Sequence, residues 1–484
     1  MARSGANGYP IGLITGVVVA SIVASLFLFG NQISALLERA AGGPVANAAS
    51  PTPKTPSVPA YDETPEAALQ RIIAAKKIIN VHEHAQGPTI TAPLLEMMDK
   101  NGMAMTCLMG SSKFTLTLQE SVGFVDYDAN NEAILKMQLD MPDRFEAWPT
   151  INPMDPQKLE KITSLVQRGA KGVKLYLGHG YVRRDNGNYM FHTVAMDDPD
   201  LDPFFAFCEK NFVPVCLHVN PYLTGFAQEL FHVLTKYPNL KANCPHFVLS
   251  SINQDRLREI LDTFPNVYSD ISFGHDDFLR QGMARISKNN DRFRKLINDY
   301  PDRFFFGTDL VLTDYEGKTP EWMQVRVQAY YHLLTAATYT SELLPMPKFS
   351  ALDKNNDGKL SSKEADDVAT INDFGIGKFD TDGDGFLNPT ELPKENTLRG
   401  LELRGPLLDN ILYQNFLNFL ELKPTDTKIT REINWERMGV EKVDRKPGQA
   451  FPPAPKKAPG TTTKKKPFDP LGSINKSINE PLPQ

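Results

Sequence analysis

The stretch that decides the fold is residues 78–84, Ile-Ile-Asn-Val-His-Glu-His, an apolar run that ends in two histidines one residue apart. Alternate side chains of a β-strand point to the same face, so we expect His82 and His84 to face one spot and Glu83 to point away. Imidazole is the commonest metal ligand, and two imidazoles at the end of a buried strand can begin a metal site. A His-x-His pair also occurs without any metal, so the interpretation depends on the residues that end the later strands.

Seven further apolar runs lie downstream and alternate with amphipathic stretches. The runs are 103–109, 145–151, 172–177, 213–219, 240–247, 267–272 and 303–309, and the clearest helical stretches are 155–167, 201–211, 224–237 and 255–264. Near-continuous apolar strands separated by helices predict a parallel sheet, and eight strands can close a (β/α)8 TIM barrel. A doubly wound open sheet is the alternative, but its Gly-rich loop does not follow the first strand.

Composition divides the rest of the chain. We expect a membrane anchor at 1–32, a Pro/Ala/Ser/Thr-rich linker at 33–65, the barrel at 66–345 and 398–424, an insertion at 346–397, and a disordered Pro/Lys-rich tail at 425–484. Apolar residues in 400–422 recur with the period of an α-helix, which predicts that the last barrel helix comes after the insertion.

The first segment has the composition of a membrane span. Residues 11–30 are uncharged, apolar and about long enough to cross a hydrocarbon core. A cleaved signal peptide is the alternative, although its small-residue cleavage site would normally lie closer to the apolar run. An anchor with Arg3 kept inside places the catalytic part in the periplasm or outside the cell.

Net charge and cysteine content exclude two classes of protein. The formal charge of −6 and the lack of a dense basic stretch argue against nucleic-acid binding. The chain has 4 cysteines, scattered through apolar strands and a helix, and this pattern does not resemble a disulfide framework.

Two calcium-loop patterns stand in tandem in the insertion. Each has oxygen ligands at positions 1, 3, 5 and 9, a glycine at position 6 and a glutamate at position 12, which resembles an EF-hand. The expected ligands are Asp353, Asn355, Asp357, Lys359, Ser361 and Glu364 in the first loop, and Asp380, Asp382, Asp384, Phe386, Asn388 and Glu391 in the second. The flanking helices are short, so we expect two calcium ions to stabilise a compact clip that rigidifies one wall of the active site. A calcium-regulated switch is the alternative.

Chemistry-bearing residues end several of the expected strands, where a barrel carries its functional groups. They are His82 and His84 on the first strand, Lys174 on the fourth, His218 on the fifth, His246 on the sixth and Asp309 on the eighth. The chain resembles the amidohydrolase superfamily, and in particular its branch of decarboxylases and lactone hydrolases. The stretches that carry the resemblance are 80–84, 172–175, 213–218, 266–272, 306–309 and 409–415.

The resemblance implies one divalent ion, zinc or alternatively manganese, held by His82, His84, His218 and Asp309. It also implies that Asp309 takes a proton from the metal-activated water and that His246 bonds the substrate or moves a proton. Lys174 could instead bridge a second metal in carboxylated form. Arg183 or Arg184, after the fourth strand, could pair with a substrate carboxylate or be a surface charge.

The function expected from these features is a membrane-anchored, metal-dependent hydrolase of a small molecule with a calcium-binding insertion. A non-oxidative decarboxylase would use the same metal set. A calcium-dependent surface binding or scaffolding protein with an inactive barrel is the alternative from another class. Substrate and oligomeric state stay open.

Overall fold

A computed structural model describes residues 63–111, 126–176, 182–183, 189–190, 194–222, 224–274, 276–426, 428–440, 442 and 446–448. Within these ranges no helix is both long and apolar enough to cross a membrane, which takes about 20 residues. This finding contradicts the predicted single-pass localisation. The stretch 11–30 on which that prediction rested lies outside the described residues.

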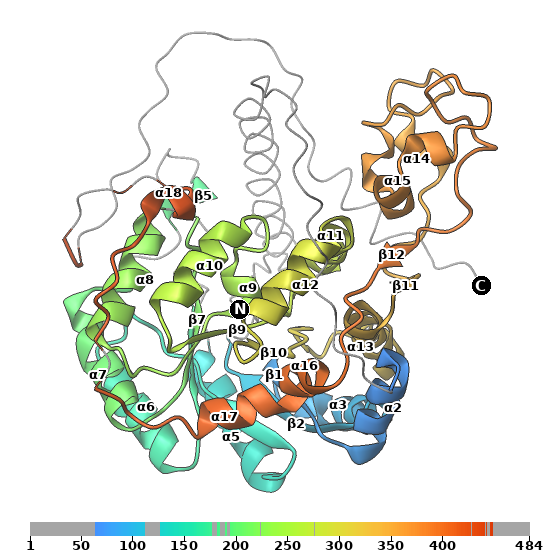
Figure 1. Ribbon diagram of the computed structural model, residues 1–484. Coiled ribbons are helices and arrows are strands. Elements are labelled where there is room, and N and C mark those ends of the chain that lie inside the picture. The colour runs from blue at the N-terminus through green and yellow to red at the C-terminus, as the bar shows by residue number, and fades with distance from the viewer. Residues whose placement is uncertain are drawn as a thin grey trace, which may run out of the picture.

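Eight parallel strands form the centre of the protein in two hydrogen-bonded sheets, β1-β2-β3 and β4-β7-β8-β9-β10 (Figure 1). Their bounds are β1 Ile78–His84, β2 Met103–Met109, β3 Phe145–Trp148, β4 Val173–Tyr176, β7 Val215–His218, β8 Ala242–Asn243, β9 Val267–Asp270 and β10 Phe304–Phe305. Each of the eight predicted strands is present, and most are shorter than their apolar runs.

Backbone contacts join the two sheets into a closed barrel. Lys174 N donates to Pro149 O at 2.9 Å, which links β3 to β4. On the other side Val81 N donates to Phe306 O at 3.0 Å, and Asp309 N donates to His82 O at 2.8 Å. The predicted TIM-barrel closure is therefore correct, and it places the end of β10 beside the end of β1.

Helices surround the strands (Figure 1). They are α2 Pro65–Ala75, α3 Thr91–Lys100, α5 Tyr127–Asp140, α6 Lys158–Gln167, α7 Asp202–Lys210, α8 Thr224–Lys236, α9 Pro245–Val248, α10 Gln254–Thr263, α11 Asp276–Lys288, α12 Asn290–Asp299 and α13 Pro320–Thr335. Local signals explain where they begin: Thr319 caps α13 by accepting from Trp322 N at 3.2 Å, and Pro320 fills the first helical position.

The end of the barrel interior that lies away from the histidines is filled by apolar side chains. The cluster comprises Ile79, Val81, Cys107, Met109, Trp148, Cys216, Tyr268, Phe305, Phe416 and Phe419. The last two come from α17 (Asn415–Leu420), which comes after α16 (Pro406–Asp409) and a π-helical turn at Asn410–Gln414. This is the helix predicted at 400–422, and it covers the end of the barrel opposite the histidines. All four cysteines are buried and free.

The EF-hand pair leaves the barrel through a two-stranded neck, β11 (Thr338–Tyr339) and β12 (Leu398–Arg399) (Figure 1). Its helices are short, as predicted: α14 Phe349–Leu352 and α15 Ala369–Phe374, with 3-10 turns at Ala365–Asp367 and Ile376–Lys378. The two calcium loops pair through Leu360 and Leu387, whose backbone groups exchange hydrogen bonds of 2.8 and 3.0 Å. The insertion also has its own hydrophobic core.

The chain beyond residue 425, predicted as a disordered tail, includes a described segment packed on the barrel. There α18 (Trp435–Met438) contacts α10, and the buried carboxylate of Glu259 binds Arg431 at 2.8 Å and Arg437 at 3.0 Å. The remaining short elements are the hairpin β5 (Val182–Arg183) and β6 (Tyr189–Met190), and 3-10 turns at Pro88–Ile90 and Pro199–Leu201.

Candidate metal centre

The end of β1 supplies two imidazoles, but the regular alternation of side chains along a strand does not explain their direction. The pairing register of β1 with β2 shifts between Asn80 and Glu83. Val81 faces the barrel interior, and His82 and His84 then both reach toward Asp309, with Nε2 to Oδ1 distances of 3.8 and 3.9 Å. Such a bulge re-aims side chains at the rim of a barrel. The expectation that both histidines face one spot is met, and the bulge sets their direction.

His246 reaches the same spot by an unusual backbone. The predicted strand 240–247 ends at Asn243, and His246, Phe247, Val248 and Leu249 adopt left-handed φ values of 62°, 54°, 54° and 48°. The strand prediction is wrong here because Pro245 has no N–H for a ladder bond. The turn brings His246 Nε2 to 3.6 Å from Asp309 Oδ2, and ligand atoms of His82, His246 and Asp309 lie within 4.8 Å of one another.

His218 ends β7, as predicted, and lies at the edge of this group. Its ring centroid is 5.1 Å from that of His246 and 4.7 Å from that of Tyr176. Its side chain is buried, but the ligand atoms that lie within 4.8 Å of one another belong to His82, His246 and Asp309 and do not include His218.

Two residues at the end of β9, absent from the predicted site, set the protonation of the histidines. Asp270 Oδ2 lies 3.0 Å from His82 Nδ1, and Ser272 O lies 2.9 Å from His246 Nδ1. A carboxylate and a carbonyl can only accept, so each Nδ1 carries the hydrogen and each Nε2 presents a lone pair toward Asp309. Asp270 and Ser272 are two positions apart in an apolar strand, and this spacing was the available signal.

The pKa values of His84 and His246 agree with neutral imidazoles. Burial lowers the pKa of His246 to about 3, against the attraction of Asp270, and burial also lowers the pKa of His84. Burial would raise the pKa of Asp270, but the charge and hydrogen bond of His82 lower it below its ordinary value. Burial raises the pKa of Asp309, against His82 and Lys174. Neutral imidazoles are the form that binds a metal.

The side chain of Glu83 points away from the histidines, as predicted, yet it holds the loop that carries Asp309. Both of its oxygens accept hydrogen bonds. The donors are His84 N (3.0 Å) and Val311 N (2.9 Å) to Oε1, and the Thr308 hydroxyl (2.7 Å) and Leu310 N (3.2 Å) to Oε2. Asp309 itself has a φ of 49°, and a Cβ on Gly274 would lie 2.8 Å from its Oδ2. The position of Asp309 therefore depends on Glu83 and on a glycine at 274.

Lys174, on β4, lies inside the same group. Its Nζ is 3.2 Å from His82 Nε2 and 3.4 Å from Cys216 Sγ, and its side chain is buried. The lone pair on His82 Nε2 can bind only one partner at a time. It can therefore hold either a metal ion or the Lys174 ammonium group, but not both.

The donor set fits a divalent ion. Two ligands at about 2.05 Å from a tetrahedral ion lie about 3.3 Å apart. The separations of 3.8 and 3.9 Å between Nε2 of His82 and His84 and Asp309 Oδ1 are close to that value. Asp309 Oδ1 is buried without a hydrogen-bond partner among the described residues, which leaves its lone pairs at the site unused.

The insertion gathers the predicted calcium ligands around each loop. In the second loop, carboxylate oxygens of Asp380, Asp382 and Glu391 lie within 4.8 Å of one another. In the first loop, Asp353 accepts from Gly358 N at 3.0 Å, and Glu364 accepts from the Ser361 hydroxyl at 2.7 Å. The other predicted ligands are Asn355, Asp357, Lys359, Asp384, Phe386 and Asn388, all in the same two loops. Lys359 Nζ crosses between the loops and binds Asp384 at 2.6 Å.

The predicted arginines of the substrate loop are not placed in the site. Arg183 belongs to the backbone of β5, but its side chain and all of Arg184 are outside the described residues.

A closed (β/α) barrel with histidines and an aspartate at its strand ends defines a barrel metal enzyme. Residues 79–341, more than half of the 484 residues, match the family model described as amidohydrolase. The chain belongs to the amidohydrolase family and is a metal-dependent enzyme. Residues 348–364 and 371–394 match the EF-hand model, so the insertion is an EF-hand pair.

Individual known proteins resemble the chain only distantly. No curated protein matches it. Among solved structures it is similar to an uncharacterised TIM-barrel protein of Bordetella bronchiseptica (18% identity, 51% of this chain, 90% of that one, TM-score 0.36). It is also similar to a probable 2-pyrone-4,6-dicarboxylic acid hydrolase of Acinetobacter baumannii (15% identity, 52% of this chain, 91% of that one, TM-score 0.35). A third similar structure is 2,6-dihydroxybenzoate decarboxylase from Rhizobium (16% identity, 52% of this chain, 91% of that one, TM-score 0.32). Likenesses this weak carry no argument about activity.

Proposed function

We propose that this protein is a hydrolase that activates water on one divalent ion, zinc in the first place and manganese as the alternative. The proposed ligands are His82, His84, His218 and Asp309, with a small molecule as substrate. One observation carries the proposal: His82 and His84 bring Nε2 to 3.8 and 3.9 Å from the same buried oxygen, Asp309 Oδ1.

The bound ion would supply a water whose pKa is lowered toward neutrality. Asp309 has an oxygen left over to accept the proton of the attacking water. His246, with its hydrogen fixed on Nδ1 by the Ser272 carbonyl, presents Nε2 to hydrogen-bond the substrate or to carry a proton to the leaving group. Asp270 orients His82 so that its lone pair remains at Nε2.

Metal analysis of the purified protein tests the site. We expect one zinc or manganese per chain, and His82→Ala should lose it. His332→Ala is the matched control, because that histidine lies on α13 outside the metal group. Full metal content in His82→Ala would overturn the proposed ligand set, and a wild-type protein that takes up no such metal would favour the inactive-barrel alternative.

Lys174 decides between one ion and two. Its contact with His82 competes with the ion, so we propose that it is not a ligand. Lys174→Met then keeps one metal per chain with equal or higher affinity. If wild-type protein holds two ions and the variant holds one or none, Lys174 bridges them and the single-ion proposal fails.

A non-oxidative decarboxylase remains the second candidate, because the same residues could orient a carboxylated substrate and deliver a proton to carbon. The assay that separates the two measures release of carbon dioxide alongside cleavage of esters, lactones and amides. Carbon dioxide release without hydrolysis would replace the first proposal by the second.

We also propose that the EF-hand pair binds two calcium ions and holds one wall of the active site. The insertion contacts α11, where the Ser287 hydroxyl donates to Asp373 at 2.9 Å and Lys288 pairs with Asp366 at 3.0 Å. The other end of α11 begins just after Gly274, which packs on Asp309. Removing calcium with a selective chelator should lower both melting temperature and turnover with zinc retained. If neither changes, the insertion does not support the site.

A further inference from the structure

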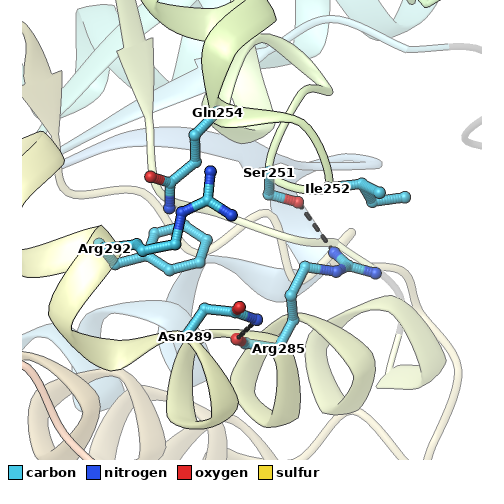
Figure 2. Close-up of a pocket in the computed structure, with 7 residues that line it drawn as sticks. Ser251, Ile252, Gln254, Arg285, Asn289 and Arg292 are labelled. Carbon is cyan, nitrogen blue, oxygen red and sulfur yellow. Dashed lines mark hydrogen bonds between the residues drawn. The ribbon is translucent and has the colours of Figure 1, made fainter. Parts of the chain in front are cut away.

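A cavity of about 200 Å³ lies among α10, α11, α12 and the loop before α10 (Figure 2). It shares no lining residue with the metal centre, and the metal chemistry does not use it. Its volume is below the roughly 300–1,000 Å³ of pockets that hold drug-sized ligands, so it suits one small chemical group.

Positive charge dominates its lining. Arg285 of α11 and Arg292 of α12 both line the cavity, and none of the lining residues is acidic. The Arg285 guanidinium donates to the Ser251 hydroxyl at 2.8 Å. Among the described residues neither arginine forms an ion pair. By contrast, Arg326 of α13 binds both oxygens of Asp276.

Burial makes the unpaired guanidinium of Arg285 costly without an anion, whereas Arg292 is exposed. Burial lowers the pKa of the Arg285 guanidinium, and no carboxylate opposes that shift. Buried charges are normally paired, because removing a cation from water without a partner is unfavourable. Gln254 is 5% exposed, and its side-chain amide has no hydrogen-bond partner in the described part of the chain. Three residues around one space thus keep donors free for a ligand.

The start of α12 adds to the positive potential. Asn289 is its N-cap residue and Arg292 its third residue, and both line the cavity. The Asn289 side chain does not cap the helix but donates to Arg285 O at 2.9 Å. The Arg292 N–H donates to Asn289 O at 3.0 Å, so the helix contributes through its dipole, which is positive at this end.

We propose that this cavity binds a small oxyanion, a phosphate or carboxylate group, between the guanidinium groups of Arg285 and Arg292. The planar fork of N–H donors on each arginine matches the oxygens of either group, and the Gln254 amide supplies a further donor. Such a site balances the charge that the protein itself leaves unpaired.

The site lies between the two metal-binding parts of the protein. Phe293, which lines the cavity, packs edge-on against Phe247 at 5.5 Å, next to His246 of the metal centre. On α11, Ser287 and Lys288 lie just beyond Arg285 and contact the EF-hand pair. An anion here would therefore stabilise the helix that connects both.

Calorimetric titration of the full-length protein with inorganic phosphate, and separately with acetate, tests the proposal. We expect one anion per chain, with phosphate and acetate distinguishing the two oxyanion classes. Arg285→Gln and Arg292→Gln should each weaken binding about tenfold or more, since each removes charge-assisted hydrogen bonds. Arg280→Gln is the matched control, because Arg280 lies on the same helix, pairs with Asp277 and does not line the cavity.

Thermal unfolding of each variant checks that it folds, and exposed Arg292 provides the decisive variant if Arg285→Gln does not fold. Absence of binding by both anions, or unchanged affinity in both cavity variants, would overturn the proposal. The readout does not depend on the metal centre, so a failed hydrolase proposal would leave this result unaffected.

Discussion

Replacement of Glu83 by glutamine should destabilise the protein although the two side chains have nearly the same shape. Both oxygens of Glu83 face two hydrogen-bond donors each. In Glu83→Gln, one oxygen becomes an NH2 group, so a donor must point at donors in either orientation. The less costly orientation places NH2 toward Thr308, whose hydroxyl can turn, and leaves the Leu310 N–H unsatisfied.

The magnitude can be worked out from these contacts. An unsatisfied buried N–H costs about 1–3 kcal/mol, and two charge-assisted bonds that become neutral lose about 1 kcal/mol each. Burial raises the pKa of Glu83 to about 8, so unfolding is measured at about pH 9, where the carboxyl is ionised and accepts all four hydrogen bonds. Relief of the unfavourable burial of that charge returns part of the loss. We expect a net loss of about 2–4 kcal/mol in the free energy of unfolding. The loosened Asp309 loop should also weaken zinc binding by about 10–100-fold, the usual effect of residues that support metal ligands.

Urea unfolding of the metal-free protein and competition with a chromophoric zinc chelator measure the two effects. Glu316→Gln is the control, because that change removes the same charge from an exposed site in the same loop. If Glu83→Gln unfolds within about 0.5 kcal/mol of that control and binds zinc equally well, then Glu83 does not hold the Asp309 loop.

Three further outcomes are expected. Asp270→Asn should weaken zinc binding about 10–100-fold by disturbing the His82 tautomer, and an unchanged affinity by chelator competition would refute this. Burial depresses the pKa values of His84 and His246, the latter to about 3, so their contribution to stability is full above the unfolded value of about 6.5. This contribution is lost as pH falls below that value, because the unfolded chain then binds protons that the buried histidines do not. Urea unfolding of metal-free protein at pH 7.5, 6 and 5 should therefore show a steady decline in the free energy of unfolding. Glu391→Gln should lower calcium affinity at least tenfold by titration calorimetry and leave zinc content unchanged, whereas equal calcium binding would exclude that ligand.

Local pattern was enough to predict the barrel and the EF-hand pair. Each apolar run of the barrel is long enough to be interpreted as a strand. The run 103–109 is β2, and the run 267–272 contains all of β9. The calcium loops are recognisable because all their ligands lie within about twelve residues of sequence. The strand prediction failed after Cys244, where the backbone departs from regular geometry. An alternating sequence pattern predicts side-chain direction only in a regular strand.

The residues of the candidate metal centre can be proposed from the sequence, but not how they are supported. His82, His84, His218, His246 and Asp309 were selected because each ends an expected strand. The supporting contacts join residues far apart in the chain, such as His82 with Asp270 and Glu83 with Val311. No local spacing carries such information.

The sequence by itself determined which elements form and which residues stand at their ends, since strand length, helix caps and calcium-loop spacing are local properties. Only the tertiary structure decided where those residues point. Barrel closure brings β10 beside β1, the bulge in β1 turns His82 inward, and the left-handed turn aims His246 at Asp309. The same closure packs α10, α11 and α12 around two unpaired arginines. Contacts of this kind depend on the whole fold, because they arise only when distant segments exclude water together.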